Sequence, residues 1–192
     1  SFRVLKSRSM DVKVALLAAA GSFIGSGIAA HIVLMLDDQI LKRIVIIFLP
    51  VAAAVIFLNR GYGTENHSDG LSKRQKIVFS LLIGLLIGFY DGMVGPGTGT
   101  FAIIAFSILM KYDVEMASGN AKLLNLASNY ASLITYAVNG NVFWIAAVPA
   151  AFCNVLGSYF GSGLALKKGA AFIRPMILCV MILLMFKLVS DI

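Results

Sequence analysis

The sequence predicts an all-α, polytopic membrane protein built from inverted structural repeats with discontinuous or re-entrant short helices. Three observations support this fold class: the composition, an internal repeat, and the positions of the basic residues. The chain has 192 residues, of which 59% are hydrophobic and 13% are charged, and its mean hydropathy is +0.91. Soluble domains carry about 25% charged residues and about 45–50% apolar residues. This composition therefore excludes an ordinary soluble domain.

Apolar runs recur along the whole chain, separated by short polar loops. A helix needs about 20 apolar residues to span a bilayer. The runs 77–90 and 101–110 are short for a full crossing. Pro50 lies inside the second run and is expected to bend it, because proline removes one helical hydrogen bond. The runs cover residues 14–36, 44–58, 77–90, 101–110, 117–138, 142–166 and 176–189.

Two of these runs contain the same short sequence. GSFIGSGIA at 21–29 and GSYFGSGLA at 157–165 are identical at six of nine positions and offset by 136 residues. We therefore predict that residues 1–58 are the end of a first repeat, 59–76 a cytoplasmic linker loop, and 77–192 a second repeat with about five membrane segments. The first-repeat counterparts of the runs between 77 and 138 would precede residue 4, so a preceding segment of roughly 60 residues is expected.

The basic residues predict how the chain is oriented in the membrane. Twelve Lys and Arg residues lie in loops 1–13, 59–76, 111–116 and 167–174, whereas the opposite side carries only Lys42 and Arg43. Cytoplasmic loops are enriched in Lys and Arg, so the first group is expected to be cytoplasmic. The two repeated segments then run in opposite directions, which is the inverted architecture of many secondary transporters. The net charge of +7 is thus explained by topology, and no nucleic-acid partner is expected.

The stretch GFYDGMVGPGTGT at 88–100 is the first candidate site, because it is an irregular segment between two apolar runs. Irregular backbone at membrane depth is tolerated only where it is buried in protein or lines a polar cavity. The first N–H groups of the helix that follows lack internal partners and attract anions. A packing turn without a ligand is the alternative. The candidate substrate-binding residues here are Gly95, Gly97, Thr98, Gly99 and Thr100.

Asp91 is the acidic residue of this stretch and is a candidate for proton coupling or gating. Intramembrane carboxylates are energetically costly and often functional. The alternative is a structural carboxylate that caps the next helix or bonds to nearby backbone.

The run 117–138 is unusually polar for a membrane helix. Lys122, Asn125 and Asn129 are spaced by three and four residues and so share one helix face. A polar face of this kind must contact protein or water. Together with Asn120 these residues are candidates for substrate binding, with Lys122 supplying positive charge for an anion. Alternatively, Lys122 extends to the nearby cytoplasmic edge.

Other motifs favour structure over chemistry. Ser26 and His31 resemble the pair of an intramembrane hydrolase, but in the second copy of the repeat the position of His31 is Lys167. The Gly-x-x-x-Gly pairs, including Gly21 with Gly25 and Gly84 with Gly88, predict close helix packing. The two cysteines show no metal-ligand spacing, and no disulfide framework, metal or cofactor is expected.

Three segments, GFYDGMVGPGTGTF, ASGNAKLLNLASNYASLITYAVNGNV and GSYFGSGLALK, together resemble the second half of the sulfite exporter TauE/SafE family, also called TSUP permeases. The resemblance covers about 85–192, and 14–58 looks like the end of the family's first half. It implies an inner-membrane permease for small sulfur-containing anions or carboxylates. The chain departs from the family pattern by lacking the first glycine motif. By resemblance, the glycine motif maps onto Gly92, Gly95, Gly97 and Gly99, and the polar helix onto Asn120, Lys122, Asn125 and Asn129.

These observations predict a permease that moves a small anion by alternating access, using sulfite, thiosulfate or a sulfonate as substrate. The expected partners are the substrate, the lipid bilayer and, for coupling, H⁺; a homo-oligomer is left open. The expected location is the bacterial inner membrane. An intramembrane hydrolase using Ser26 and His31, and a passive anion channel, are the alternatives.

Overall fold

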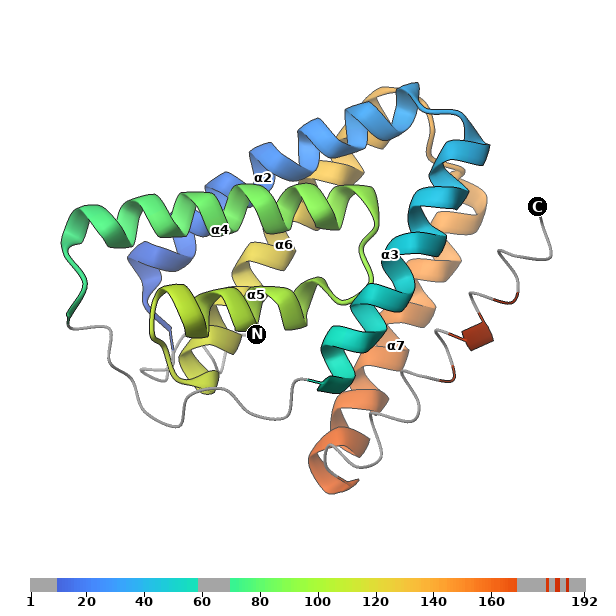
Figure 1. The fold of residues 1–192 in the computed structure, drawn as a ribbon. Coiled ribbons are helices and arrows are strands. Elements are labelled where there is room, and N and C mark those ends of the chain that lie inside the picture. The colour runs from blue at the N-terminus through green and yellow to red at the C-terminus, as the bar shows by residue number, and fades with distance from the viewer. Residues whose placement is uncertain (1–9, 59–69, 169–178, 180–181, 184–185, 187–192) are drawn as a thin grey trace. The chain divides into compact units, whose positions relative to one another are not determined.

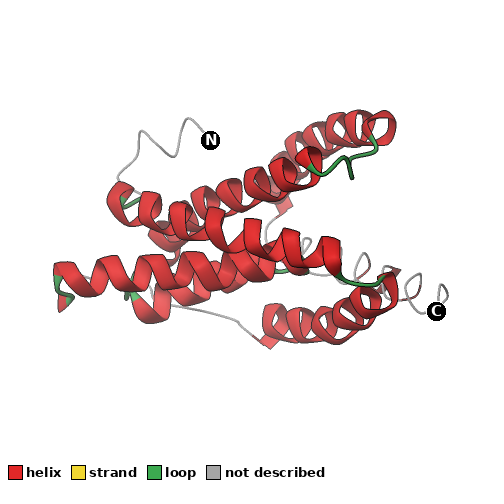
Figure 2. Ribbon diagram, turned by 90° about the horizontal axis from the view of Figure 1, so that it is seen from above, coloured by secondary structure: helices red, strands yellow, loops and turns green. Residues whose placement is uncertain are grey.

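The computed structural model describes residues 10–58, 70–168, 179, 182, 183 and 186. Within these residues the secondary structure is helical, with turns and loops and no strand, as Figure 2 shows. The all-α prediction is therefore confirmed. The described helices are α2 (Val12–Met35), α3 (Asp38–Leu58), α4 (Lys73–Met93), α5 (Thr98–Leu109), α6 (Val114–Val138) and α7 (Trp144–Lys168).

Two of these helices, α2 and α4, are long and apolar enough to cross a membrane, and α5 is a shorter apolar helix. The expectation that the run 77–90 is short is wrong, because α4 begins four residues earlier and ends later, giving 21 residues. A capping box explains the early start: the Ser72 side chain accepts from the Gln75 backbone N–H, and the Gln75 side chain accepts from the Ser72 N–H. Such reciprocal bonds satisfy donors that a helix start otherwise leaves unpaired.

The chain divides into two compact units, residues 1–135 and 136–192. The first unit holds α2 to α5 and most of α6, and the second holds the end of α6 and α7. This division lies inside a helix and not in the predicted linker 59–76, most of which lies outside the described residues. The division into repeats, their inversion, and the last apolar run stay predictions, because the two units are described separately.

Helices α2 and α4 lie side by side in the first unit (Figure 1) and pack through glycines. A Cβ atom added at Gly25 would lie 2.2 Å from the Leu85 carbonyl oxygen, and one at Gly84 would lie 2.1 Å from the Ala18 carbonyl oxygen. Only glycine permits backbones to approach so closely. The predicted packing role of these Gly-x-x-x-Gly pairs is therefore confirmed. At Gly157, in the other repeat copy, an added Cβ would meet no described atom within 4 Å.

Helix α6 is tied to α2 by serine side chains. The Ser22 hydroxyl donates to the Leu124 carbonyl oxygen at 3.0 Å, and the Ser26 hydroxyl lies 2.8 Å from the Ser128 carbonyl oxygen. The Ser26 hydroxyl also lies 2.7 Å from that of Ser132. Both α2 serines are fully buried. Together with the glycine contacts between α2 and α4, these hydrogen bonds hold α2, α4 and α6 in one packed group.

One further contact joins the ends of this group. The Tyr112 hydroxyl, in the link between α5 and α6, donates to the Asp11 carboxylate at 2.9 Å, while Asp11 caps the start of α2. Burial and the adjacent Asp11 carboxylate raise the pKa of Tyr112, so its hydroxyl stays protonated. The N-terminal end of α2 is thereby fixed to the turn that precedes α6.

Candidate functional site

The predicted glycine stretch forms a tight connection between α4 and α5. Only residues 94–97 separate the two helices, and α5 then runs back alongside α4 (Figure 1). Gly95 and Gly97 have φ angles of +84° and +89°, in the left-handed region that favours glycine. These two glycines therefore allow a long membrane helix to be followed at once by a short helix of the opposite direction.

The N–H groups at the start of α5 are partly engaged by the loop itself. The Thr98 N–H donates to the Gly95 carbonyl oxygen at 3.3 Å, and the Thr100 N–H donates to the Gly97 carbonyl oxygen at 2.9 Å. An anion at this helix start would have to share these donors. By contrast, a Cβ added at Gly99 would meet no atom of the described residues within 4 Å, so among these residues nothing covers that side of the first turn of α5.

Asp91 lies in the last turn of α4, where it joins three helices. The Thr98 hydroxyl of α5 donates to one carboxylate oxygen at 2.7 Å, and the buried Ser128 hydroxyl of α6 donates to the other. Asp91 thus bonds the first residue of α5 through its side chain, which corresponds to the structural alternative of a carboxylate bonded beside the next helix. The same contacts place the Asp91 side chain between the glycine stretch and α6. The geometry is therefore compatible with both interpretations of Asp91, a structural carboxylate and a group for proton coupling or gating.

Each of the two hydroxyls also has a second acceptor within reach. Thr98 contacts the Gly95 carbonyl oxygen, and the Ser128 hydroxyl lies 3.0 Å from the Asn125 carbonyl oxygen. A hydroxyl carries one hydrogen, so each can donate either to Asp91 or to a backbone carbonyl, but not fully to both.

Tyr90 supports the loop from the side. Its hydroxyl donates to the Pro96 carbonyl oxygen at 2.7 Å, and its ring contacts Phe101 edge-on with 5.0 Å between centroids. Sequence reasoning missed Tyr90 and Ser128 as site residues. Ser128 lies three residues after Asn125 in the polar helix, and that helical spacing was the available signal.

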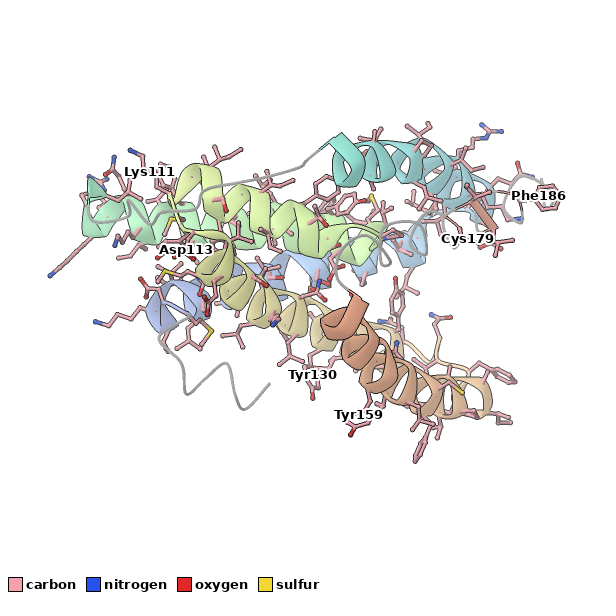
Figure 3. All side chains as sticks on the ribbon, turned by 90° about the horizontal axis from the view of Figure 1, so that it is seen from below. Lys111, Asp113, Tyr130, Tyr159, Cys179 and Phe186 are labelled. Carbon is pink, nitrogen blue, oxygen red and sulfur yellow. The ribbon has the colours of Figure 1, made fainter. Side chains whose placement is uncertain are left out.

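The predicted polar residues of α6 fall into separate groups. Asn125 and Asn129 bond each other, because the Asn129 amide nitrogen lies 2.8 Å from both the carbonyl oxygen and the side-chain oxygen of Asn125. Asn129 is exposed, and the neighbouring Tyr130 is also exposed and extends outward from α6 (Figure 3). Lys122 is exposed on the same helix. Lys122, Asn125 and Asn129 form a polar stripe along α6. Ser128 connects this stripe to Asp91, because its hydroxyl contacts both the Asn125 carbonyl oxygen and the Asp91 carboxylate.

Asn120 does not belong to the stripe. It is fully buried and lies on the face of α6 that carries Leu124 and Ser128. Asn120 therefore faces the apolar core, apart from Lys122, Asn125 and Asn129, and its role in substrate binding stays a prediction.

The hydrolase pair is not assembled. The Ser26 hydroxyl is buried against α6, whereas His31 is exposed. Five residues along a helix correspond to a rotation of about 140°, so the two side chains point in different directions.

Apolar helices joined by a glycine loop, with a half-buried carboxylate beside that loop, are consistent with an integral membrane protein. The family model of "Sulfite exporter TauE/SafE" matches residues 1–188. The chain belongs to this family, and the family confirms the resemblance.

Similar proteins carry the names of membrane transporters. A "Probable membrane transporter protein" of Haemophilus influenzae is 29% identical over 192 residues, covering all of this chain and 74% of the relative. YfcA of Escherichia coli K12, also named a probable membrane transporter protein, is 33% identical over 91% of the chain and 64% of its own length. The probable membrane transporter ORF9 of Sinorhizobium sp is 35% identical over 94% and 67%. The chain thus spans about two thirds to three quarters of these relatives, and no solved structure gives a significant match.

Proposed function

We propose that this membrane transporter moves a small anion by alternating access and that protonation of Asp91 is coupled to the movement. The observation that carries the proposal is the pair of hydroxyl bonds to Asp91, one from the start of α5 and one from α6. A carboxylate in this position is hydrogen-bonded both to the end of the glycine stretch and to the polar helix α6. The family name supports a sulfur-containing anion such as sulfite, thiosulfate or a sulfonate.

The coupling follows from the number of hydrogens in the network. When Asp91 is ionised, it accepts from both Thr98 and Ser128. When it is protonated, one oxygen becomes a donor, and a hydroxyl that loses its acceptor turns to its second one, the Gly95 or the Asn125 carbonyl oxygen. Protonation therefore changes the bonds of the loop and of the stripe without leaving a buried hydroxyl unpaired.

The anion would bind where positive and donor groups are accessible. The exposed Lys122 ammonium and the amides of Asn125 and Asn129 supply charge and N–H donors on α6, and the open side of Gly99 gives access to the start of α5. Of the remaining predicted residues, Gly95 and Gly97 shape the loop, and an anion at the start of α5 would share the Thr98 and Thr100 N–H groups with the loop carbonyl oxygens that they already contact.

The proposed membrane topology is the one predicted from the distribution of Lys and Arg residues. The chain would cross the bacterial inner membrane several times, with the basic loops in the cytoplasm. Rocking of one repeat against the other would expose the site to each side in turn. A passive channel differs from this mechanism in having a flux that neither saturates nor depends on a proton gradient.

The deciding experiment compares Asp91→Asn with the wild-type protein in proteoliposomes, using sulfite, thiosulfate, a sulfonate and a small carboxylate as substrates. We expect the variant to lose stimulation by an imposed proton gradient while retaining exchange of substrate across the membrane, because the amide cannot gain a proton. Ser22→Ala is the matched control, since it removes a buried hydroxyl that bonds α6 away from Asp91.

Retained gradient stimulation in Asp91→Asn would show that Asp91 is not the coupling group. Loss of both net uptake and exchange, with normal insertion and unfolding temperature, would assign it to substrate binding or gating. A flux that rises linearly with substrate concentration for every anion would favour the channel. Thermal shift with the same panel reports binding separately, because a ligand of the folded state raises its stability.

A further inference from the structure

Helices α2, α4 and α6 meet in two successive layers of the same construction. In each layer a fully buried α2 serine places its hydroxyl against a backbone carbonyl oxygen of α6, and its backbone against an α4 glycine. The first layer holds Ser22, Gly88 and Leu124, and the second holds Ser26, Gly92 and Ser128. The layers are four residues apart in every helix, which is about one turn. Ser22 and Ser26 therefore occupy equivalent structural positions.

Of these two layers, the second contains the residues next to Asp91. Gly92 follows Asp91 in α4, and the Ser128 hydroxyl donates to the Asp91 carboxylate. A Cβ added at Gly92 would lie 2.6 Å from the Ser26 carbonyl oxygen, and the Ser26 hydroxyl oxygen lies 2.8 Å from the Ser128 carbonyl oxygen. Because α4 and α6 both contact the same α2 residue, Ser26 fixes the separation across which Asp91 and Ser128 hydrogen-bond.

The direction of the Ser26 hydrogen bond follows from its neighbours. A hydroxyl carries one hydrogen, and a carbonyl oxygen accepts but does not donate. The Ser26 hydroxyl lies beside the Ser128 carbonyl oxygen and, at 2.7 Å, beside the Ser132 hydroxyl. Both contacts are satisfied when Ser26 donates to Ser128 and accepts from Ser132. The Ser26 hydrogen is then committed to the backbone of Ser128.

The Ser128 hydroxyl is sensitive to the position of its own helix. It contacts the Asp91 carboxylate on α4, and it lies 3.0 Å from the Asn125 carbonyl oxygen on α6. A small movement of α6 away from α4 lengthens the first contact and leaves the second unchanged, because Asn125 belongs to the same helix. Whatever holds α6 at Ser128 therefore determines which acceptor the hydroxyl uses.

We propose that Ser26 is a positioning residue for the hydrogen bond between Ser128 and Asp91. Its hydroxyl holds the Ser128 backbone while its own backbone rests against α4 beside Asp91. The positioning role stands on these contacts, whereas its consequence for transport rests on the proposed function of Asp91. In that function, loss of the Ser26 hydroxyl weakens the coupling of transport to the proton gradient.

Nuclear magnetic resonance of the protein labelled with [4-¹³C]aspartate, in nanodiscs at one fixed pH, tests the positioning role. The carboxyl signal of Asp91 is identified by its loss in Asp91→Asn, and Ser128→Ala gives its displacement when the hydrogen bond is absent. We expect Ser26→Ala to displace the signal in the same direction by a smaller amount. Ser26→Cys keeps nearly the same shape but offers a weak donor, so its signal should lie between those of the wild-type protein and Ser26→Ala.

Ser22→Ala is the matched control, because it removes an equally buried hydroxyl that bonds α6 one turn away. Its unfolding temperature should fall about as much as that of Ser26→Ala, while its Asp91 signal stays at the wild-type position. Equal displacement in both alanine variants would show general loosening and overturn the proposal. A wild-type signal in Ser26→Ala and Ser26→Cys, or in Ser128→Ala, would also overturn it. If Ser26→Ala does not fold, Ser26→Cys against Ser22→Ala decides the question.

A transport measurement separates this inference from the proposed function. In proteoliposomes, stimulation of uptake by a proton gradient should be weaker in Ser26→Ala than in Ser22→Ala. If Asp91→Asn keeps its gradient stimulation, the coupling role of Asp91 fails, but a displaced Asp91 signal in Ser26→Ala still supports the positioning role. If the signal is not displaced, the positioning role fails whatever the transport result.

Discussion

Two hydroxyl groups determine the surroundings of Asp91. Thr98 and Ser128 come from different helices, and each can turn from the carboxylate to a backbone carbonyl oxygen. A buried polar network of this kind is stable only when all of its members are satisfied. The second acceptors provide that condition in both protonation states. At the scale of single residues, the proposed protonation of Asp91 would use these second acceptors.

Gly97 is one of the two loop glycines with a positive φ angle, the other being Gly95. Its φ of +89° would place a larger side chain in the left-handed region, at a cost of about 1–2 kcal/mol. We expect Gly97→Leu to abolish uptake in proteoliposomes while membrane insertion stays intact, because the start of α5 would move away from Asp91.

Gly140→Leu is the matched control for Gly97→Leu. Gly140 also has a positive φ, +71°, but it lies in the turn that follows α6, and an added Cβ would meet no described atom within 4 Å. This variant carries similar backbone strain without altering the loop. Normal uptake by Gly97→Leu would refute the assignment of the glycine loop to the site.

At the scale of helices, the contact between α2 and α4 provides the rigid part of the first unit. Glycines on each helix face backbone of the other, so neither helix can shift without breaking close contacts. The serines of α2 extend the same group to α6. The helix α5 packs against this group as well, since its Ala102 and Phe106 lie in the same apolar core as Ile83 of α4.

Gly25→Leu tests the contact between α2 and α4. Its Cβ would lie 2.2 Å from the Leu85 carbonyl oxygen, and backbone cannot give way as a flexible side chain can. Overpacking typically costs about 1–3 kcal/mol, so we expect a clear fall in the temperature of thermal unfolding measured in detergent.

Gly157→Ala serves as the reference for Gly25→Leu. An added Cβ there would meet no described atom, and alanine is the better helix former by about 1 kcal/mol. This variant should unfold at the same temperature as the wild-type protein or slightly higher. Equal unfolding temperatures for Gly25→Leu and the wild-type protein would mean that the two helices do not pack as described.

At the scale of the whole molecule, the distribution of charge predicts the sidedness of the loops. In the predicted topology twelve basic residues fall on one side, and Lys42 and Arg43, near the start of α3, fall on the other. Because the two compact units are described separately, sidedness has to be measured on the intact protein in its membrane.

Labelling of single cysteines in intact bacteria measures this sidedness. Cys153 and Cys179 are free and exposed, so they are first replaced by serine. We expect a membrane-impermeant maleimide to label Gln39→Cys from outside, and to label His67→Cys only after the membrane is opened. Labelling of both positions from outside would contradict the predicted orientation.

Much of the fold followed from local sequence. For the described helices the apolar runs gave the ends to within six residues, the largest difference being the start of α3, since burial of backbone polar groups in lipid requires helices. The start of α4 was missed, because its first turn is polar and is specified by Ser72 and Gln75 and not by hydrophobicity. The glycine break before α5 was predicted because glycine and proline interrupt helices wherever they cluster.

The site was only partly predictable. Asp91 and the glycine stretch are unusual at membrane depth, so composition alone singled them out. Ser128 joined them only through contact between residues 37 positions apart. Asn120 was grouped with the stripe by its residue type, although its position on the helix turns it toward the core.

By itself, the sequence determined the class of this protein, its helices, its internal repeat and its resemblance to the TauE/SafE family, because all of these depend on patterns along the chain. The tertiary structure decided which polar side chains meet: Asp91 with Thr98 and Ser128, Ser26 with α6 and not with His31, and Asn120 with the core. The physical reason is that hydrogen bonds form between groups within about 3 Å in space, and only the packing of glycine-lined helices brings these groups so close.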